Sequence, residues 1–244
     1  MSSSYSRPPR SAMTPLRVRA FLQTPVISDL YLPIDSVLWY HAMRAEYGVQ
    51  IVTSPGSDHE VRAPGVSLPI ARCEEHGPLW YYAASFAQWA GSGIAMGQDH
   101  WSSRFDHSLV DLIDWRGKKA RVEVSSGPLK SYRVPVYYIH ALSIDWHLLA
   151  LRSWVEWILP FVTHLGKKGA QGWGAVLRWD IEPWHADWSV RDDAGNLMRA
   201  IPSSDGKGQF AGFRPSYWMP KNQAICECPS DLRVCQFPLE EVRA

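Results

Sequence analysis

The most informative stretch of the sequence is GKKGAQGWG at residues 166–174, which holds four glycines and two lysines. Glycine lets the backbone adopt left-handed conformations and approach a ligand closely. Successive backbone amides can then form a concavity that binds an anion, and Lys167 and Lys168 add attraction for phosphate. The Gly-x4-Gly-Lys-Ser/Thr pattern of a P-loop is absent, and the loop precedes an expected strand instead of a helix. The alternative is a flexible connector between helix and strand, which the paired lysines disfavour.

Hydrophobic patterns on both sides of this loop predict a mixed α+β fold. Residues 16–22 alternate between apolar and polar side chains, which is typical of a half-buried strand. Val37, Leu38 and Ala42 form the apolar stripe of a helix that ends at Gly48. The helices are expected at residues 33–48 and from residues 143–146 to 162, and the strands at 16–22, 79–89, 120–125, 133–142 and 175–181. This order is the β-α-β-β-α-β plan of the ferredoxin-like fold, which RNA-recognition modules share.

The chain is expected to contain one main domain with a leader, an insertion and an extension. The leader, residues 1–13, is rich in Ser, Pro and Arg and is expected to be disordered. The ferredoxin-like domain is expected at residues 14–181, with an insertion at about 90–119 where glycines and polar residues interrupt the apolar pattern. Residues 182–244 form a C-terminal extension rich in Pro and Trp, with short strands at most. Apolar residues make up 46 % of the chain, which is enough for a substantial core.

Charge and aromatic content favour a ligand that carries phosphates and flat rings. The formal net charge is only +1, so the chain is no simple polycation, but its basic residues are clustered. Residues 116–133 contain six Lys and Arg residues and one Glu. Unpaired bases stack on aromatic rings, and the chain has thirteen tryptophans, with Trp173 inside the glycine loop. The alternatives are a solvated charged face and tryptophans that fill the core.

The four cysteines are Cys73, Cys226, Cys228 and Cys235. One interpretation is a zinc site formed by these residues with His76, although the spacing matches no common zinc-finger pattern. The other is plain reduced cysteines in the cytoplasm, where we expect the protein because no apolar signal-peptide stretch is present. No run of about 18 apolar residues predicts a membrane span. No cofactor or metal is expected.

Three segments resemble a known protein family. Residues 163–174, THLGKKGAQGWG, are similar to the glycine-rich loop of CRISPR RAMP proteins. Residues 126–135, SGPLKSYRVP, and 32–38, LPIDSVL, resemble one branch of that family, the type IV effector subunit of the Cas-five class. The resemblance covers roughly residues 14–180. It implies a RAMP core whose thumb-like insertion occupies residues 90–119.

The function that this resemblance implies is non-catalytic. Such a subunit binds the 5′ handle of a CRISPR guide RNA and contacts the backbone and large subunits of a ribonucleoprotein that targets DNA. Target DNA is a further partner, and no membrane is involved. The RNA-binding residues that we expect are Arg17, Arg19, Lys130, Ser131, Tyr132, Arg133, His164, Lys167, Lys168, Gly169, Gln171, Gly172 and Trp173.

Two other functions stay open. Some RAMP relatives cleave precursor RNA without a metal through a histidine, and His41, His140 and His164 are the candidates here. His41 lies on the apolar stripe of the first helix, so a core histidine is the simpler interpretation. His140 is expected to be packed within a strand. The remaining alternative is an unrelated protein-interaction module rich in tryptophan, which would have no affinity for RNA at physiological salt.

Overall fold

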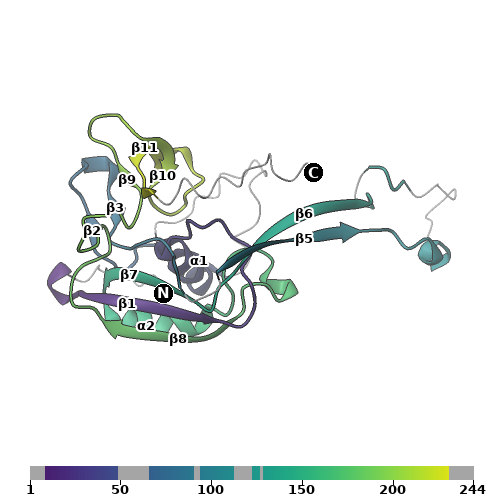
Figure 1. Ribbon diagram of the computed structural model, residues 1–244, viewed down its shortest axis with the longest axis horizontal. Helices are drawn as coiled ribbons and strands as arrows, with labels where there is room; N and C mark the ends of the chain where they lie inside the picture. The colour runs from purple at the N-terminus through teal and green to yellow at the C-terminus, as the bar shows by residue number, and fades with distance from the viewer. Residues whose placement is uncertain (1–8, 49–65, 91–93, 113–122, 127–128, 231–244) are drawn as a thin grey trace.

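The structure is a computed structural model, and it describes residues 9–48, 66–90, 94–112, 123–126 and 129–230. The described chain forms two α-helices, short 3-10 turns and several antiparallel sheets, so the predicted α+β class is confirmed. A body built around a four-stranded sheet carries a smaller C-terminal unit, and a long two-stranded ribbon projects from it (Figure 1). None of the described helices is long and apolar enough to cross a membrane.

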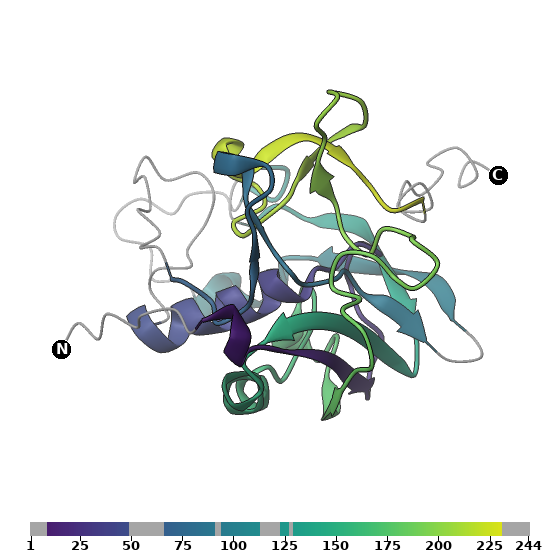
Figure 2. The same cartoon turned by 90° about the vertical axis from the view of Figure 1, so that its left-hand side faces the viewer.

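The central sheet has the strand order β4-β7-β1-β8, and all neighbouring strands are antiparallel. These strands are β1 (Thr14–Leu22), β4 (Gln88–Ala90), β7 (Ser143–Ala150) and β8 (Val176–Pro183). Helix α1 (Ile34–Tyr47) connects β1 to the β4 side of the sheet, and helix α2 (Arg152–Ile158) follows β7. Both helices cover one face of the sheet, where Leu38 and Val155 share a core with Val18 and Trp146 (Figures 1 and 2).

Strand β1 shows why the alternation in residues 16–22 predicts it correctly. Leu16, Val18 and Ala20 are buried against the helices, whereas Arg17 and Arg19 lie half-buried on the opposite face. Side chains in a strand point alternately to the two faces, so one face supplies the apolar core and the other stays open to polar groups. This open face of the sheet carries Arg17 and Arg19 in the observed register, as expected.

The expected helix from residues 143–146 to 162 is wrong for its first half. Residues 143–150 form strand β7, and the helix α2 is only Arg152–Ile158, followed by the 3-10 turn η5 (Leu159–Phe161). Every residue of β7 is buried, and Ile144, Trp146 and Leu148 pack under the helices. On the other face, Asp145 is paired with Arg19, His147 lies against the rings of Trp184 and Trp188, and Leu149 packs with the C-terminal unit. The sequence does carry the signal of a strand, because Ser143, Asp145 and His147 alternate with Ile144, Trp146 and Leu148, and the helix prediction missed it.

The expected strand at 79–89 is also divided. The 3-10 turn η3 (Gly77–Leu79) precedes β3 (Tyr81–Tyr82), which pairs with β2 (Arg72–Cys73), and only β4 joins the central sheet. The C-terminal unit is a three-stranded sheet of β10 (Gln209–Gly212), β11 (Gln223–Glu227) and β9 (Ile201–Pro202), in that order, with the 3-10 turn η7 (Pro220–Asn222) before β11. Its strands are short, as the sequence predicts for the extension.

The leader is ordered further toward the N-terminus than expected. Residues 1–8 lie outside the described residues, but Arg10–Ala12 form the 3-10 turn η1 and Met13 is buried. Met13 packs in a second core with Tyr81, Phe213 and Cys226, between β2–β3 and the C-terminal unit. The predicted end of the disordered leader at residue 13 is therefore too late, because the apolar side chain of Met13 packs in this core.

The projecting ribbon consists of β5 (Ala95–Ser103) and β6 (Tyr132–His140), paired from Ala95–His140 to Ser103–Tyr132 (Figure 1). At its base, Val26 and Ile139 exchange two backbone hydrogen bonds of 2.9 and 2.8 Å. The 3-10 turn η4 (His107–Leu112) follows β5. The projecting segment is therefore longer than the expected insertion at 90–119. The strand expected at 133–142 is β6, and its partner is β5 instead of the central sheet.

The strand expected at 120–125 is not observed. Residues 120–122 lie outside the described residues, and residues 123–126 form no strand. The basic run from Arg116 to Arg121 also lies outside the described residues, so only Lys130 and Arg133 of that cluster are placed.

Candidate nucleic-acid interface

The glycine loop connects η5 to β8 and is held by backbone hydrogen bonds to residues 24–27. The Lys167 amide donates to Ile27 O at 2.7 Å, and the Gly174 amide donates to Pro25 O at 2.8 Å. Thr24 Oγ1 donates to Gly172 O at 2.7 Å and accepts from the Ala175 amide at 2.9 Å. The loop is therefore a fixed part of the fold, and the interpretation as a flexible connector is wrong.

Glycine is required at particular positions of this loop. Gly174 has φ +69°, and a Cβ atom there would lie 2.0 Å from Leu165 O. Gly166 has φ +74°, and its Cβ would lie 2.4 Å from Ile27 O. Gly172 also has a positive φ, but open space surrounds its Cβ position. Two glycines thus allow backbone segments to pass close together, and one serves only the turn.

Three of the backbone amides of the loop that were expected to bind phosphate donate hydrogen bonds within the protein instead. We expected the Gly169–Gly174 backbone to contact phosphate, but three of its amides are already used. Gln171 and Gly172 donate to Lys168 O and Gly169 O within the 3-10 turn η6 (Gly169–Gln171), and Gly174 donates to Pro25 O. An amide that donates within the protein is not free for an anion. Contacts to a ligand therefore fall mainly to the side chains of the loop.

The loop lies against the base of the projecting ribbon, which the sequence does not reveal. Lys168 Nζ lies 3.8 Å from the centroid of the Trp101 ring on β5, a cation–π contact. The Trp173 ring lies 5.3 Å from the Tyr138 ring on β6. Tyr138 in turn covers Gly97 on the opposite strand, where a Cβ atom would collide with the ring. Lysine and aromatic rings from two distant segments therefore share one surface.

Other predicted residues extend this surface along the ribbon. Tyr132 is 38 % exposed, and its hydroxyl accepts a hydrogen bond of 2.7 Å from Trp101 Nε1. Lys130, Ser131 and Arg133 are exposed beside it. Within the described part of the chain, no ion pair includes Lys130, Arg133, Lys167 or Lys168. These cations therefore keep their charge available for an external anion.

Arg17 and Arg19 are paired with acidic side chains, unlike the other predicted cations. Arg19 donates two hydrogen bonds, of 2.5 and 2.6 Å, to the carboxylate of Asp145, and this hydrogen bonding raises its pKa. Arg17 forms an ion pair of 2.7 Å with Glu182 and lies over the Trp184 ring at 4.6 Å. Each of these two charges already has a partner on the open face, so it is less available to a phosphate than the charges of the loop lysines.

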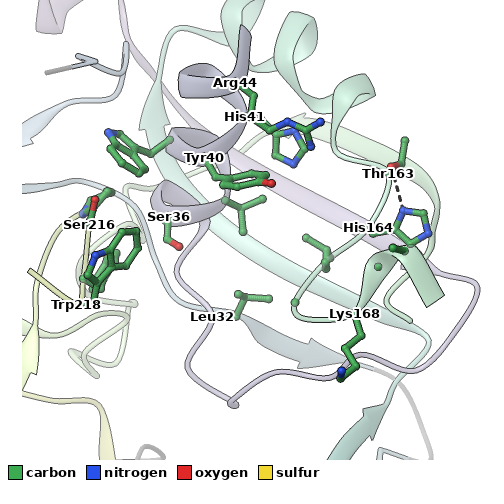
Figure 3. A pocket seen from close by; sticks show the side chains of 18 residues that line it. Leu32, Ser36, Tyr40, His41, Arg44, Thr163, His164, Lys168, Ser216 and Trp218 are labelled. Atoms are coloured by element: carbon green, nitrogen blue, oxygen red, sulfur yellow. Dashed lines mark hydrogen bonds between the residues drawn. The ribbon is translucent and has the colours of Figure 1, made fainter. Parts of the chain in front are cut away.

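A cleft of about 630 Å³ lies beside the glycine loop. One wall is α1, with Ser36, Tyr40, His41 and Arg44, and a second wall is formed by His164, Lys168 and the neighbouring loop residues. Residues 215–218 of the C-terminal unit form the third wall. Figure 3 shows His41 and Arg44 side by side on α1, with Ser216 and Trp218 on one side of them and His164 and Lys168 on the other.

The three histidines proposed as catalytic candidates lie in two different places. His41 and His164 both line the cleft, whereas His140 is exposed on β6 and the expectation that it is packed is wrong. Burial lowers the pKa of His41 to about 4, and the charge of Arg44 acts in the same direction. His41 is therefore neutral at pH 7. His164 Nδ1 lies 3.0 Å from Thr163 Oγ1, at hydrogen-bonding distance (Figure 3).

A buried polar network holds the third wall in place. Arg199 is fully buried, forms an ion pair of 3.6 Å with Asp35 at the start of α1, and donates to Ala84 O at 2.8 Å. Tyr217 donates a hydrogen bond of 2.8 Å to the same carboxylate. Burial raises the pKa of Asp35, and the charge of Arg199 opposes that rise. The network therefore attaches residues 215–218 to the helix that forms the opposite wall.

Several residues of this interface are not among the predicted ones. Arg44, Tyr40, Trp101, Tyr138 and Trp218 come from four different segments, and nothing in their local sequence marks them as ligands. One signal exists: α1 carries Tyr40 and Arg44 on the side away from its apolar stripe, where a purely structural helix has no need of a ring. The other signal is the number of tryptophans, which exceeds what the core uses, since Trp218 is 66 % exposed.

The zinc interpretation finds no support among the described residues, which contain no group of three His, Cys, Asp or Glu side chains able to hold a metal. Cys73 and Cys226 are buried in the second core, where burial raises the pKa of each thiol. Cys235 lies outside the described residues. The described cysteines thus fit the alternative interpretation, plain reduced thiols.

The fold and the interface together define an α+β protein with a cationic and aromatic surface that spans a loop, a ribbon and a cleft. No family model matches the chain, and no curated protein matches it.

Proposed function

We propose that this protein is a guide-RNA-binding RAMP subunit of a type IV CRISPR effector complex, of the Cas-five class, and that it binds RNA without cleaving it. The strand order β4-β7-β1-β8, with one helix after the first strand and one after the third, matches the ferredoxin-like arrangement that the resemblance implies. In this proposal the ribbon β5–β6 is the thumb-like insertion, and the partners are the guide-RNA handle, the backbone and large subunits, and target DNA.

The observation that carries the proposal is the meeting of the glycine loop with the ribbon. There, Lys168 lies over the ring of Trp101, and the ring of Trp173 in the loop lies against that of Tyr138 on the ribbon. Single-stranded nucleic acid is bound by cations that follow its backbone and by rings on which its bases stack. Aromatic rings are also common at protein–protein interfaces, but lysine is depleted there, so unpaired lysines next to rings suit RNA better.

The test is an electrophoretic shift assay on the full chain with a labelled CRISPR repeat RNA in EDTA. We expect a shifted complex that contains intact RNA. The double variant Lys167→Ala, Lys168→Ala should weaken binding and flatten the dependence of log K on log salt by about 1.4, because each neutralised phosphate of a single strand contributes about 0.7.

The matched control is the double variant Arg191→Ala, Lys207→Ala, which also removes two cations. Both of these lie on the C-terminal unit, in ion pairs with Glu227 and Asp205. It should keep the salt slope of the unmodified protein. An unchanged slope in the loop variant, or equal slopes in both variants, would remove the glycine loop from the proposed interface.

A metal-independent endoribonuclease is the second candidate, and the presence of His41 and His164 in one cleft favours it. A neutral histidine can accept a proton from the 2′-hydroxyl of RNA, and a second group can protonate the leaving oxygen. In the same EDTA assay this function predicts cleavage at one position of the repeat. His41→Ala and His164→Ala should each abolish that cleavage, whereas His140→Ala should not.

A further inference from the structure

The cleft beside the glycine loop has the chemistry of a nucleotide site. Arg44 supplies its cation, since the ammonium group of Lys168 lies over Trp101 outside the cleft, and none of the described residues that line it is Asp or Glu. Ser36 and Thr163 add hydroxyl groups, and His41 adds a neutral ring. A cleft that holds a cation without any carboxylate attracts an anion, and the absence of a paired acid leaves that attraction unopposed.

Aromatic rings give the cleft a second property. Tyr40 is 37 % exposed and Trp218 is 66 % exposed, although rings of this size are usually buried in a core. The Trp218 ring lies at an angle to the Trp39 ring, with 6.4 Å between the centroids, so its position is supported from one side. Arg44 lies 5.6 Å from the Tyr40 ring. An exposed ring beside a cation suits a ligand with a flat base and a phosphate.

The size and construction of the cleft also fit a single nucleotide. A volume of about 630 Å³ is within the range of small-ligand sites, which is about 300–1,000 Å³. Trp218 follows Tyr217, whose hydroxyl is fixed to Asp35 on α1 by the buried network. The C-terminal unit is therefore built into the cleft, and it supplies the ring on the side opposite Lys168 (Figure 3).

We propose that this cleft binds one unpaired nucleotide of the RNA, with its base on the rings of Trp218 and Tyr40 and its phosphate at Arg44. The proposal rests on the proposed RNA-binding function and deepens it, because it gives the C-terminal unit a direct role in holding RNA. A free mononucleotide carries the same chemistry, so the experiment has to separate the two sources.

The experiment is a titration of the full chain with a short fluorescein-labelled single-stranded RNA of mixed sequence, followed by anisotropy. Trp218→Ala should weaken binding about ten-fold, the expected loss of one base stack, and Trp218→Phe should retain most of the affinity. Arg44→Ala should weaken binding and flatten the salt slope by about 0.7. The matched controls are Trp157→Ala and Arg152→Ala on the exposed side of α2, which should bind as the unmodified protein does.

Each outcome bears on the proposal. Loss of RNA affinity in Trp218→Ala, with no displacement of the RNA by excess AMP, supports it. If AMP itself binds, and Trp218→Ala loses AMP but keeps its RNA affinity, the site belongs to a free nucleotide and the proposal is overturned. If Trp218→Ala and Arg44→Ala bind RNA normally while the Lys167 and Lys168 double variant does not, the cleft is overturned and the proposed function stands. If the unmodified chain binds no RNA, both are overturned.

Discussion

The open face of the central sheet and the surface around the glycine loop both carry basic side chains, but only one of them leaves their charge free. On the sheet, Arg17 and Arg19 are held by Glu182 and Asp145, and Arg178 lies 3.4 Å from Asp180. Around the loop, the described Lys167 and Lys168 take part in no ion pair. The number of cations therefore says little about where an anion binds, and the nearest carboxylates say more.

Arg199 is a cation whose charge is both paired and fully buried, so its removal should lower the free energy of unfolding by the largest amount. Arg199→Met leaves Asp35 buried without its cation, so the free energy of unfolding should fall by about 3–5 kcal/mol, as when one partner of a buried pair is lost. Urea denaturation measures the change. Arg152→Met, which removes one partner of an exposed pair with Glu156, should cost about 0.5 kcal/mol. A loss below about 1 kcal/mol in Arg199→Met would show that the network is not essential to the fold.

The fixed conformation of the loop can be broken at a single glycine. Gly174→Ala forces a Cβ atom against Leu165 O at a positive φ, so we expect a loss of about 3 kcal/mol. Gly172→Ala meets open space and should cost about 1 kcal/mol, from its backbone conformation alone. Thermal unfolding of the two variants side by side measures the difference. Equal melting temperatures would mean that the loop shifts freely to accept a side chain.

The open face should also respond to pH, through His147. Burial lowers the pKa of His147 to about 4, with Asp145 opposing the shift and Arg17 favouring it. The unfolded chain binds this proton near pH 6.5 and the folded chain only near pH 4, so stability is present at neutral pH and is lost as the pH falls through this window. We expect about 3 kcal/mol to be lost. His147→Gln should remove that part of the slope, whereas His140→Gln should retain it, and identical slopes in both would contradict the assignment.

The smallest effect should be a gain in RNA affinity when the acidic partners of Arg17 and Arg19 are neutralised, so that the open face carries free cations as the loop does. Asp145→Asn with Glu182→Gln releases Arg19 and Arg17, so RNA affinity should rise about five-fold and the salt slope should steepen by about 1.4. The control is Asp205→Asn with Glu227→Gln, which changes the net charge equally and releases Lys207 and Arg191 on the C-terminal unit. A gain of the same size in both variants would mean that net charge alone controls the affinity.

Local patterns predicted the elements that have one buried and one open face. The alternation in residues 16–22 gave β1, the stripe of Leu38 and Ala42 gave α1, and the glycine loop was located where the chain turns into β8. Strand β7 was mistaken for a helix although residues 143–148 alternate between polar and apolar side chains, because Leu148, Leu151 and Val155 also fit a helical stripe.

The candidate site was predicted only in part, because its walls come from distant parts of the chain. The loop lysines, Tyr132 and Trp173 were named from sequence, and the structure places the loop residues against the ribbon and Tyr132 at its far end, hydrogen-bonded to Trp101. The pairing of Arg17 and Arg19 depends on acids in β7 and β8, which register determines and local sequence does not. Residues 36–44, 163–170 and 215–218 form the cleft only after the fold has closed.

The buried contact between helix α1 and the C-terminal unit has a consequence for synthesis on the ribosome. The hydroxyl that Asp35 accepts from belongs to Tyr217, which is synthesised 182 residues later, and β1 cannot pair with β8 until that strand has also been made. Contacts between residues so far apart form slowly, because a long loop has to close first. A growing chain therefore finishes its first helix long before that helix has its final neighbours. Trp218 emerges one residue after Tyr217, so an unfinished chain cannot present a complete cleft.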